Sequence, residues 1–237
     1  MKVQNSVVFV TGANRGFGLA LAREALARGA SKVYAGMRNT AGFNEPGLVP
    51  VKLDVTDPES IAAAAARCGD VTVLVNNAGI GRIVEGALDA RMESQSREIF
   101  ETNYYGVIRV TQAFAPILVK NGGGAILNIL SIVSWIPSQV LAAYAASKAA
   151  AWSFTNSLRL QLQPQGTQVL GLHVGFMDTD LTRGVDAPKV DPADVARQAF
   201  DDMAAGKNEV LGDDVTRTVK KGLSAEQASY FDDGGLL

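Results

Sequence analysis

Short runs of apolar, β-branched residues recur along this chain of 237 residues, and segments of helical character separate them. The runs predict strands over 7–10, 32–35, 49–53, 71–75, 125–130 and 168–172. The intervening segments predict helices over 19–27, 58–67, 91–120 and 143–162, the third broken near Gly106. Near-continuous apolar strands that alternate with helices are typical of a parallel sheet covered on both faces. Because crossovers between parallel strands are right-handed, we predict an α/β, doubly wound, mostly parallel sheet in a single domain, 1–237.

The chain becomes more polar after residue 180. There we predict a helix over 192–205, a last short strand over 209–211 and a further helix over 224–230. The terminal segment 231–237 is a candidate for disorder, as chain ends often are.

Charge and composition exclude several classes of function. Lys and Arg number 22 and Asp and Glu 24, so the net charge of −2 gives no field that would attract nucleic acid or a membrane surface. Cys68 is the single cysteine and His173 the single histidine, so we expect no intrachain disulfide and no metal site. No apolar run reaches membrane-spanning length and the first residues lack a signal-peptide pattern, so we expect a cytoplasmic protein.

A glycine-rich turn joins the first predicted strand to the first predicted helix; it reads TGANRGFG over residues 11–18. Gly12 permits the tight turn, and Gly16 and Gly18 let backbone amides at the helix N-terminus approach a pyrophosphate. A glycine trio can also serve only the packing of a strand against a helix. Its position after the first strand favours a dinucleotide site.

The end of the second predicted strand bears on the choice of cofactor. An NAD site usually places a carboxylate there for the ribose hydroxyls, whereas residues 35–39 contain no acid and include Arg38. Arg15, in the glycine-rich turn, is a second cation that could reach a 2′-phosphate. We therefore predict NADP(H) in preference to NAD(H). Asp54, after the third strand, could accept from the adenine amino group or could cap the helix that begins near Pro58.

Ser131, Tyr144 and Lys148 form a candidate catalytic group. Tyr144 and Lys148 are four residues apart, so they lie on one face of a predicted helix. An ammonium group near the phenol is expected to lower the pKa of Tyr144 towards neutrality, where general acid–base catalysis is most efficient. Ser131 could hold a substrate oxygen on which charge develops. This chemistry suits hydride transfer to or from a carbonyl carbon.

With these motifs, and with NNAG over 76–79 and an asparagine at 103, nearly the whole chain resembles the short-chain dehydrogenase/reductase family. The resemblance implies a Rossmann fold and a homodimer or homotetramer built through the helices over 91–120 and 143–162. It implies that Asn103 holds a water linking Lys148 to solvent and that Lys148 also binds the nicotinamide ribose. The catalytic residues it implies are Asn103, Ser131, Tyr144 and Lys148. The cofactor contacts are Gly12, Asn14, Arg15, Gly16, Phe17, Gly18, Arg38, Asp54, Val55, Asn76, Ala78, Gly79, Tyr144, Lys148, Gly175, Met177 and Thr179.

The sequence departs from the family after the sixth strand. The family usually has Pro-Gly there, whereas this chain has Val174-Gly175, so we expect a less rigid start to the loop that contacts the nicotinamide carboxamide. His173 is expected to be structural, because the other motifs already supply an acid. In the family the substrate pocket lies beside this loop, about 176–191, which points to the following lining residues: Val133, Trp135, Val140, Leu141 and Phe176. Each could instead pack the core.

These features together predict an NADPH-dependent carbonyl reductase that acts on a neutral, moderately apolar ketone or aldehyde, with Tyr144 as general acid. The nearest alternative is an NAD(P)-dependent alcohol or hydroxysteroid dehydrogenase that runs oxidatively. A reductase of acyl-carrier-protein thioesters would want a basic patch, which the net charge does not favour. An alternative of another class is a catalytically silent NADPH-binding sensor, but such proteins typically lack the Tyr or the Lys.

Overall fold

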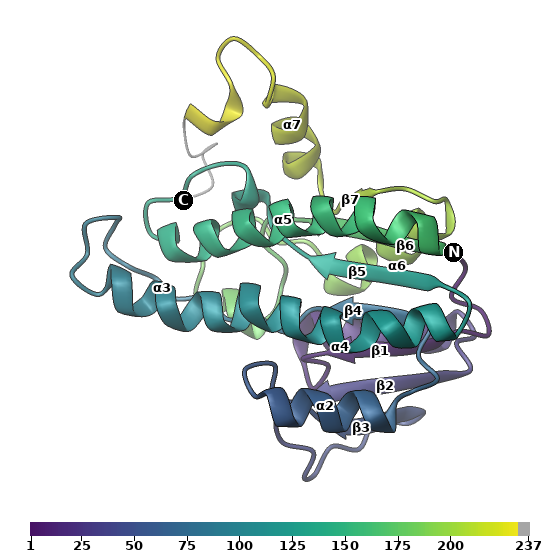
Figure 1. The fold of residues 1–237 in the computed structure, drawn as a ribbon. Coiled ribbons are helices and arrows are strands. Elements are labelled where there is room, and N and C mark those ends of the chain that lie inside the picture. Colours follow the sequence, from purple (N-terminus) through teal and green to yellow (C-terminus); the bar gives the residue numbers. More distant parts are fainter. Residues whose placement is uncertain (232–237) are drawn as a thin grey trace.

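Parallel strands form one sheet in the order β3-β2-β1-β4-β5-β6-β7 in the computed structural model, which describes residues 1–231 (Figure 1). The strands are β1 (Val7–Thr11), β2 (Lys32–Met37), β3 (Leu48–Lys52), β4 (Val73–Asn76), β5 (Gly124–Ile129), β6 (Thr167–His173) and β7 (Glu209–Leu211). The predicted α/β doubly wound sheet is confirmed, with every pair of neighbouring strands parallel.

The direction of winding reverses at β1. This strand pairs with β2 on one side and with β4 on the other, so the chain builds the sheet outward in both directions from β1. In open α/β sheets, ligands bind at such a switch point, outside the carboxyl ends of the strands. The topology therefore places the glycine-rich turn, which follows β1, at the position where a nucleotide would bind.

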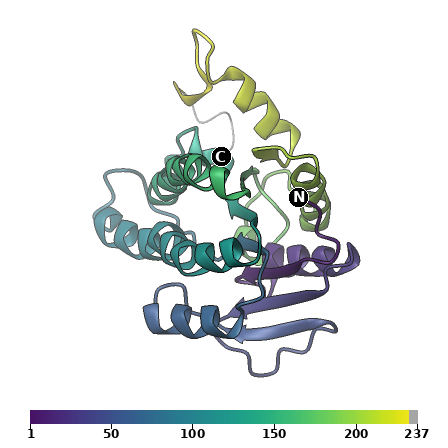
Figure 2. The same ribbon diagram turned by 45° about the vertical axis from the view of Figure 1, so that its right-hand side comes forward.

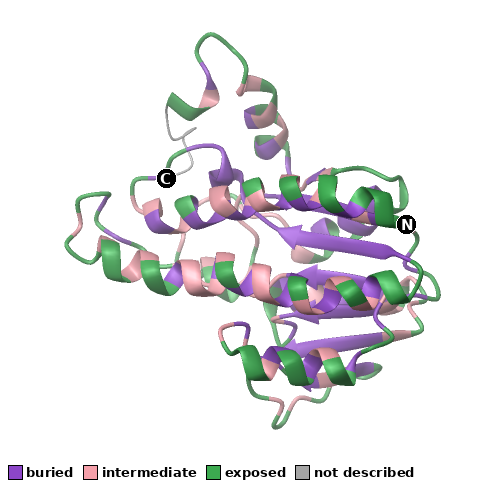
Figure 3. Ribbon diagram, viewed as in Figure 1, coloured by how far each residue is buried: buried purple, intermediate pink, exposed green. Residues whose placement is uncertain are grey.

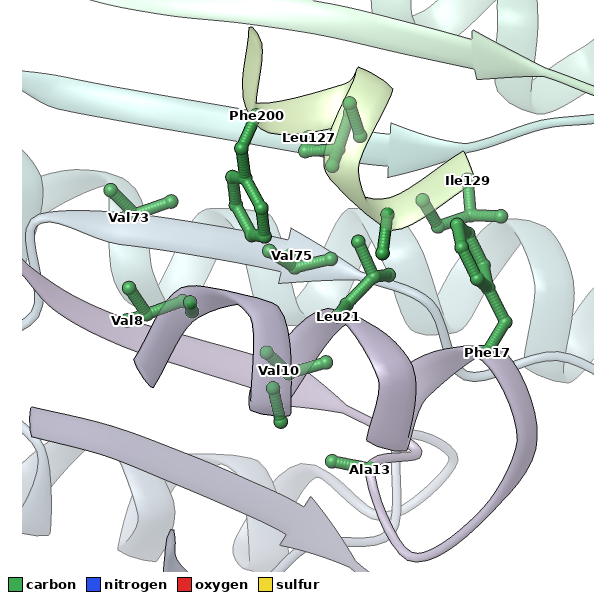
Figure 4. Close-up of a cluster of buried hydrophobic side chains, with 14 of the residues drawn as sticks. Val8, Val10, Ala13, Phe17, Leu21, Val73, Val75, Leu127, Ile129 and Phe200 are labelled. Atoms are coloured by element: carbon green, nitrogen blue, oxygen red, sulfur yellow. The ribbon is translucent and has the colours of Figure 1, made fainter. Parts of the chain in front are cut away.

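Helices cover both faces of the sheet (Figures 1 and 2). One layer contains α1 (Gly16–Ala27) and α6 (Pro192–Ala204); the other contains α2 (Pro58–Arg67), α4 (Gly106–Lys120) and α5 (Ala142–Leu162). In the first layer Phe17, Leu21 and Phe200 pack on strand residues such as Val10 and Val75 (Figure 4). Strand β5 is buried along its whole length, and the outward faces of the helices are exposed (Figure 3).

Helix and strand boundaries agree closely with the sequence patterns. Helix α2 and strand β7 have the predicted limits, whereas β4 starts at Val73, two residues later than expected. The helical segment 91–120 divides into α3 (Met92–Phe100), a π-helical turn over Glu101–Tyr105 and α4, so the break lies immediately before Gly106. No helix in the described part of the chain is long and apolar enough to cross a membrane.

The C-terminal region differs from the prediction. The last α-helix is α7 (Asp214–Gly222), and the predicted helix over 224–230 is wrong: only a 3₁₀ turn over Ser229–Phe231 forms there. Helix α7 begins where it does because the Asp213 carboxylate caps it, accepting from the Thr216 amide at 2.7 Å. Figure 2 shows α7 standing out from the body of the molecule beyond β7. Of the segment expected to be disordered, residues 232–237 lie outside the described residues.

Candidate active site

The glycine-rich turn is fastened to the end of β4 by side chains of both segments. The Thr11 hydroxyl accepts from the backbone amides of Asn77 and Ala78, each at 2.9 Å. In return the Asn77 amide nitrogen donates to the Thr11 carbonyl at 2.9 Å and to the Gly12 carbonyl at 3.3 Å. These bonds hold the two strand ends of the switch point in one fixed arrangement.

Two glycines of the turn leave no room for a side chain. Gly12 has a φ of +67°, and a Cβ on it would lie 3.0 Å from the Ala78 Cα. A Cβ on Gly18 would lie 2.3 Å from the Gly12 carbonyl oxygen and 2.5 Å from the Asn77 side chain. The backbone of α1 therefore starts directly on the turn, and no side chain caps its N-terminus among the described residues. Uncapped amides at a helix N-terminus suit a pyrophosphate.

The two arginines expected near a 2′-phosphate differ in their contacts. Arg15 is exposed and forms an ion pair of 2.9 Å with Asp180 in the loop after β6. Arg38 is exposed and follows β2 directly. Its charge contributes to lowering the pKa of Asp54, for which hydrogen bonds from Thr56 are the main cause, so the two groups lie near one another.

Asp54 does not cap α2. Its carboxylate accepts from the Thr56 hydroxyl at 2.7 Å and from the Thr56 amide at 2.9 Å, whereas Asp57 is the N-cap and accepts from the Glu59 amide at 3.0 Å. The capping alternative for Asp54 is therefore wrong. Its adenine contact stays a prediction.

Several predicted cofactor contacts have side chains that point into the protein. Asn76 is buried and its side chain donates to Thr111 at 3.0 Å and to Asn128 at 2.8 Å, which ties β4 to α4 and β5. Phe17 packs in the core of the first helix layer (Figure 4), so only its backbone faces the turn. Val55 is also buried, and a Cβ on Gly106 would lie 2.9 Å from it. Asn14 and Gly79 are exposed, and Ala78 is half-buried.

Asn103 lies in the π-helical turn and is buried. Its side chain accepts from the Ile80 amide and donates to the Ile80 carbonyl, both at 2.8 Å, and also donates to the Ser147 hydroxyl at 3.2 Å. Asn103 thus joins the segment after β4 to α5, the helix that carries Tyr144 and Lys148. Its water-holding role stays a prediction.

Ser131 and the two residues of α5 lie at the carboxyl end of β5. Ser131 follows that strand and caps a 3₁₀ turn over Ile132–Ser134. The Lys148 ammonium is buried and donates to the Ile129 carbonyl at 2.7 Å, and it lies 5.6 Å from the centre of the Tyr144 ring. The structure therefore brings Ser131, Tyr144 and Lys148 together, as the sequence predicted.

The predicted direction of the Tyr144 pKa is wrong for the protein alone. Burial raises the pKa of Tyr144 to about 12, and a hydrogen bond with Ser131 opposes this rise. Burial also lowers the pKa of Lys148 to about 8. Lys148 lies over the ring and bonds a backbone carbonyl, so its charge does not stabilise the phenolate enough to outweigh desolvation.

The loop after β6 starts from a tightly held backbone. Val174 is buried, its carbonyl accepts from the Ile132 amide at 3.0 Å, and the Gly175 amide donates to Asp213 at 2.7 Å. Further on, Met177 forms an isolated bridge with Val190, and Thr179 lies 3.7 Å from where a Gly16 Cβ would be. The loop therefore crosses over the glycine-rich turn.

The predicted substrate-pocket residues are partly taken up by packing. Trp135 stacks on His173 with ring centres 3.7 Å apart, and the Lys220 ammonium of α7 lies 4.7 Å from the Trp135 ring centre. Trp135 and Val133 belong to an apolar cluster that joins the 3₁₀ turn to α7, whereas Val140, Leu141 and Phe176 are half-buried. His173 is fully buried beside the Ser131 carbonyl and burial lowers its pKa to about 4, which agrees with a structural role. Substrate contact by the five residues stays a prediction.

Sequence reasoning missed three residues that shape this site: Thr11, Asn77 and Asp213. Thr11 lies in the glycine-rich turn and Asn77 lies beside Asn76. The two motifs therefore contain these residues but do not indicate that they bond to one another. The only sequence signal for Asp213 is an acid before a polar helix, which does not reveal its bond to Gly175. No group of side chains that could hold a metal ion occurs within residues 1–231.

Comparisons with known proteins place this geometry in a wider context. The family description "short chain dehydrogenase" matches residues 6–189. A 3-oxoacyl-(acyl-carrier-protein) reductase of Escherichia coli is 36% identical over 197 residues, 78% of this chain and 79% of the relative. A short chain dehydrogenase of Burkholderia cenocepacia in complex with NADP has a TM-score of 0.91 and 37% identity, covering 96% of each chain. A 3-ketoacyl-(acyl-carrier-protein) reductase of Brucella melitensis complexed with NADH has a TM-score of 0.79 and 27% identity over 89% of this chain and 97% of that one.

Proposed function

The chain belongs to the short-chain dehydrogenase/reductase family and is an oxidoreductase, and we propose that it is an NADPH-dependent carbonyl reductase acting on a neutral, moderately apolar ketone or aldehyde. The observation that carries this proposal is the grouping of Ser131, Tyr144 and Lys148 at the carboxyl end of β5, where the Lys148 ammonium lies 5.6 Å from the centre of the Tyr144 ring. Burial raises the pKa of Tyr144 to about 12, so the phenol of the nucleotide-free protein is protonated at neutral pH and has a proton to donate.

Each residue of the catalytic group has a separate role in the proposed reduction. When bound, the nicotinamide supplies the hydride to the carbonyl carbon. Tyr144 donates a proton to the carbonyl oxygen as negative charge develops on it, and the Ser131 hydroxyl holds that oxygen. Lys148 carries its charge beside the Tyr144 ring and binds the nicotinamide ribose. The glycine-rich turn receives the pyrophosphate, because its glycines let the α1 amides come close.

A preference for NADPH is supported by the arginines. Arg38 is exposed directly after β2, and residues 35–39 contain no acid that would repel a 2′-phosphate. Arg15 is exposed and paired with Asp180, and exposed ion pairs exchange partners at little cost, so a phosphate can compete for it. The similar Burkholderia protein was solved with NADP and the similar Brucella protein with NADH, so the comparisons leave both cofactors open for this chain.

The test is the loss of NADPH absorbance, with NADH as control, on a panel of aryl ketones, diketones, aldehydes and steroid ketones. We expect turnover with NADPH, and Tyr144→Phe should lower it by about 10²–10⁴ while NADPH binding is kept. Near-normal turnover of this variant would contradict the role of Tyr144. Tight NADPH binding without any turnover would favour the silent sensor, and faster reaction with an alcohol and NAD⁺ would favour the oxidative dehydrogenase.

A second candidate is a reductase of 3-oxoacyl thioesters, which the 36% identity to the Escherichia coli 3-oxoacyl-(acyl-carrier-protein) reductase favours. The net charge of −2 gives no general attraction for an acidic carrier protein. Acetoacetyl-coenzyme A, added to the panel, tests the thioester chemistry without a carrier. A kcat/KM far above that of the simple ketones would favour this second candidate.

Self-association is part of the proposal. Three large hydrophobic residues near the proposed interface are exposed: Tyr105 just before α4, Val119 in α4 and Leu160 in α5. A homodimer or homotetramer built through these helices would cover such residues. Sedimentation equilibrium measures the mass directly, and a monomer over the whole concentration range would refute this part.

A further inference from the structure

Asp213, between β7 and α7, holds two distant segments at once. One carboxylate oxygen accepts from the Thr216 amide at 2.7 Å and caps α7, and the other accepts from the Gly175 amide, also at 2.7 Å. Asp213 is 8% exposed, so both bonds lie largely out of water. A single buried carboxylate therefore connects the start of α7 to the loop after β6.

The neighbouring backbone leaves little freedom around this contact. The Gly212 amide donates to the His173 carbonyl at 2.8 Å, and a Cβ on Gly212 would lie 2.9 Å from a methyl group of Val174. A Cβ on Gly175 would lie 3.1 Å from the Asp213 carboxylate. Residues 173–175 and 212–213 thus pack as one closely fitted unit.

The sequence predicts a less rigid start to this loop, because Val174 stands in place of a proline. The packing of residues 173–175 against 212–213 shows how the chain holds the loop without that proline. Among residues 1–231 the Val174 amide donates no hydrogen bond, although the carbonyls of His173 and Val174 accept from Gly212 and Ile132. The next amide along the chain, that of Gly175, donates to Asp213. The loop then runs on to Thr179, which packs against Gly16 of the glycine-rich turn.

We propose that Asp213 is a positioning residue for hydride transfer: by holding the Gly175 amide, it fixes the path of the loop that places the nicotinamide. The inference rests on the proposed function, since it assumes that this loop contacts the nicotinamide. Asp213 acts through Gly175 and does not touch the reactants. Charge-assisted hydrogen bonds to backbone amides are strong enough for such a task.

Asp213→Ser separates the two duties of the side chain. Serine is a good N-cap, so the bond to Thr216 is kept, whereas the second oxygen that binds Gly175 is lost. The matched control is Asp57→Ser at the N-cap of α2, where the carboxylate accepts, among residues 1–231, from the Glu59 amide alone. We expect similar melting temperatures for the two variants. Only Asp213→Ser should lose turnover with NADPH, by about 10- to 100-fold, because a misplacement of the nicotinamide by about 1 Å has an effect of this size.

Binding measurements show where the loss arises. NADPH carries the nicotinamide, whereas 2′,5′-ADP carries only the adenosine with its 2′- and 5′-phosphates. Asp213→Ser should raise the Kd of NADPH and leave the Kd of 2′,5′-ADP unchanged. A parallel loss of both ligands would indicate general damage and overturn the proposal, as would equal turnover of Asp213→Ser and Asp57→Ser.

Val174→Pro supplies a rescue. Proline restricts φ, and no hydrogen bond of the Val174 amide is sacrificed, so proline should fix the same backbone without a carboxylate. In the Asp213→Ser background it should recover most of the lost turnover; no recovery overturns the proposal. If Asp213→Ser does not fold, Asp213→Asn, which keeps the shape and only one acceptor, takes its place. If the wild type reduces no carbonyl compound, the proposed function fails, but the two Kd values still test Asp213.

Discussion

The buried charge of Lys148 should lower the free energy of unfolding of the protein. Lys148 is 5% exposed, its only described hydrogen bond goes to the Ile129 carbonyl, and burial lowers its pKa from 10.5 to about 8. A shift of one unit corresponds to about 1.4 kcal/mol, so at neutral pH the charged form costs roughly 3 kcal/mol of folding free energy. Lys148→Met removes that cost. It also leaves the Ile129 carbonyl without a donor, which costs about 1–3 kcal/mol.

The sign follows from proton binding. Between about pH 8 and about pH 10.5 the unfolded lysine binds more protons than the folded one, so the wild type gains stability as the pH rises. The penalty is complete below pH 8 and is lost above the unfolded pKa. Lys148→Met should therefore be as stable as the wild type, or up to about 2 kcal/mol more stable, at about pH 7. Its advantage should fall by about 2–3 kcal/mol by about pH 10.

Urea unfolding of the nucleotide-free protein measures this difference, with Lys52→Met as the control because Lys52 is an exposed lysine at the end of β3. The control should keep a constant difference from the wild type over the same pH range. Turnover of Lys148→Met should be almost abolished although the fold is intact. Parallel pH dependence for Lys148→Met and the wild type would refute the reasoning.

Two further predictions concern the nucleotide. Arg38→Ala should raise the Kd of NADPH by about tenfold or more and leave that of NADH nearly unchanged, because one charge-assisted hydrogen bond to the 2′-phosphate is lost; equal losses in fluorescence titrations of the two would remove Arg38 from the phosphate site. Gly18→Ala should abolish nucleotide binding and lower the melting temperature, since its Cβ would lie 2.3 Å from the Gly12 carbonyl oxygen. Gly69→Ala, where nothing lies within 4 Å of the added Cβ, is its control, and equal melting temperatures for the two would falsify the steric argument.

The parts of the fold that the sequence predicted are those whose signals are local. Helix α2 carries an N-cap acid at Asp57, a proline at its first position and an apolar stripe, so its limits were readable. Strand β5 is buried on both faces and is apolar except for Asn128. Helix α7 has few apolar residues. Its start is set by the Asp213 cap, and Lys220 near its end lies over Trp135, a tertiary contact that a local pattern does not contain.

The candidate site divides in the same way. Tyr144 and Lys148 could be predicted as neighbours because four residues bring two side chains onto one helix face. The direction of the Tyr144 pKa could not, because it depends on how deeply the phenol is buried and on where the ammonium points. Asn77 and Thr11 are similar: adjacent motifs locate them, but only the pairing of β1 with β4 makes them hydrogen-bond partners.

A single loop links the two halves of the candidate cofactor site. At its start Gly175 is held by Asp213, and further on Thr179 packs against Gly16 while Asp180 pairs with Arg15. The end that would meet the nicotinamide is therefore anchored by a buried carboxylate, and the end over the phosphates by an exposed ion pair. Exposed ion pairs are weak, whereas a buried carboxylate that accepts two hydrogen bonds holds its partners strongly. The loop should accordingly open at its Asp180 end to admit the nucleotide while its Gly175 end stays in place.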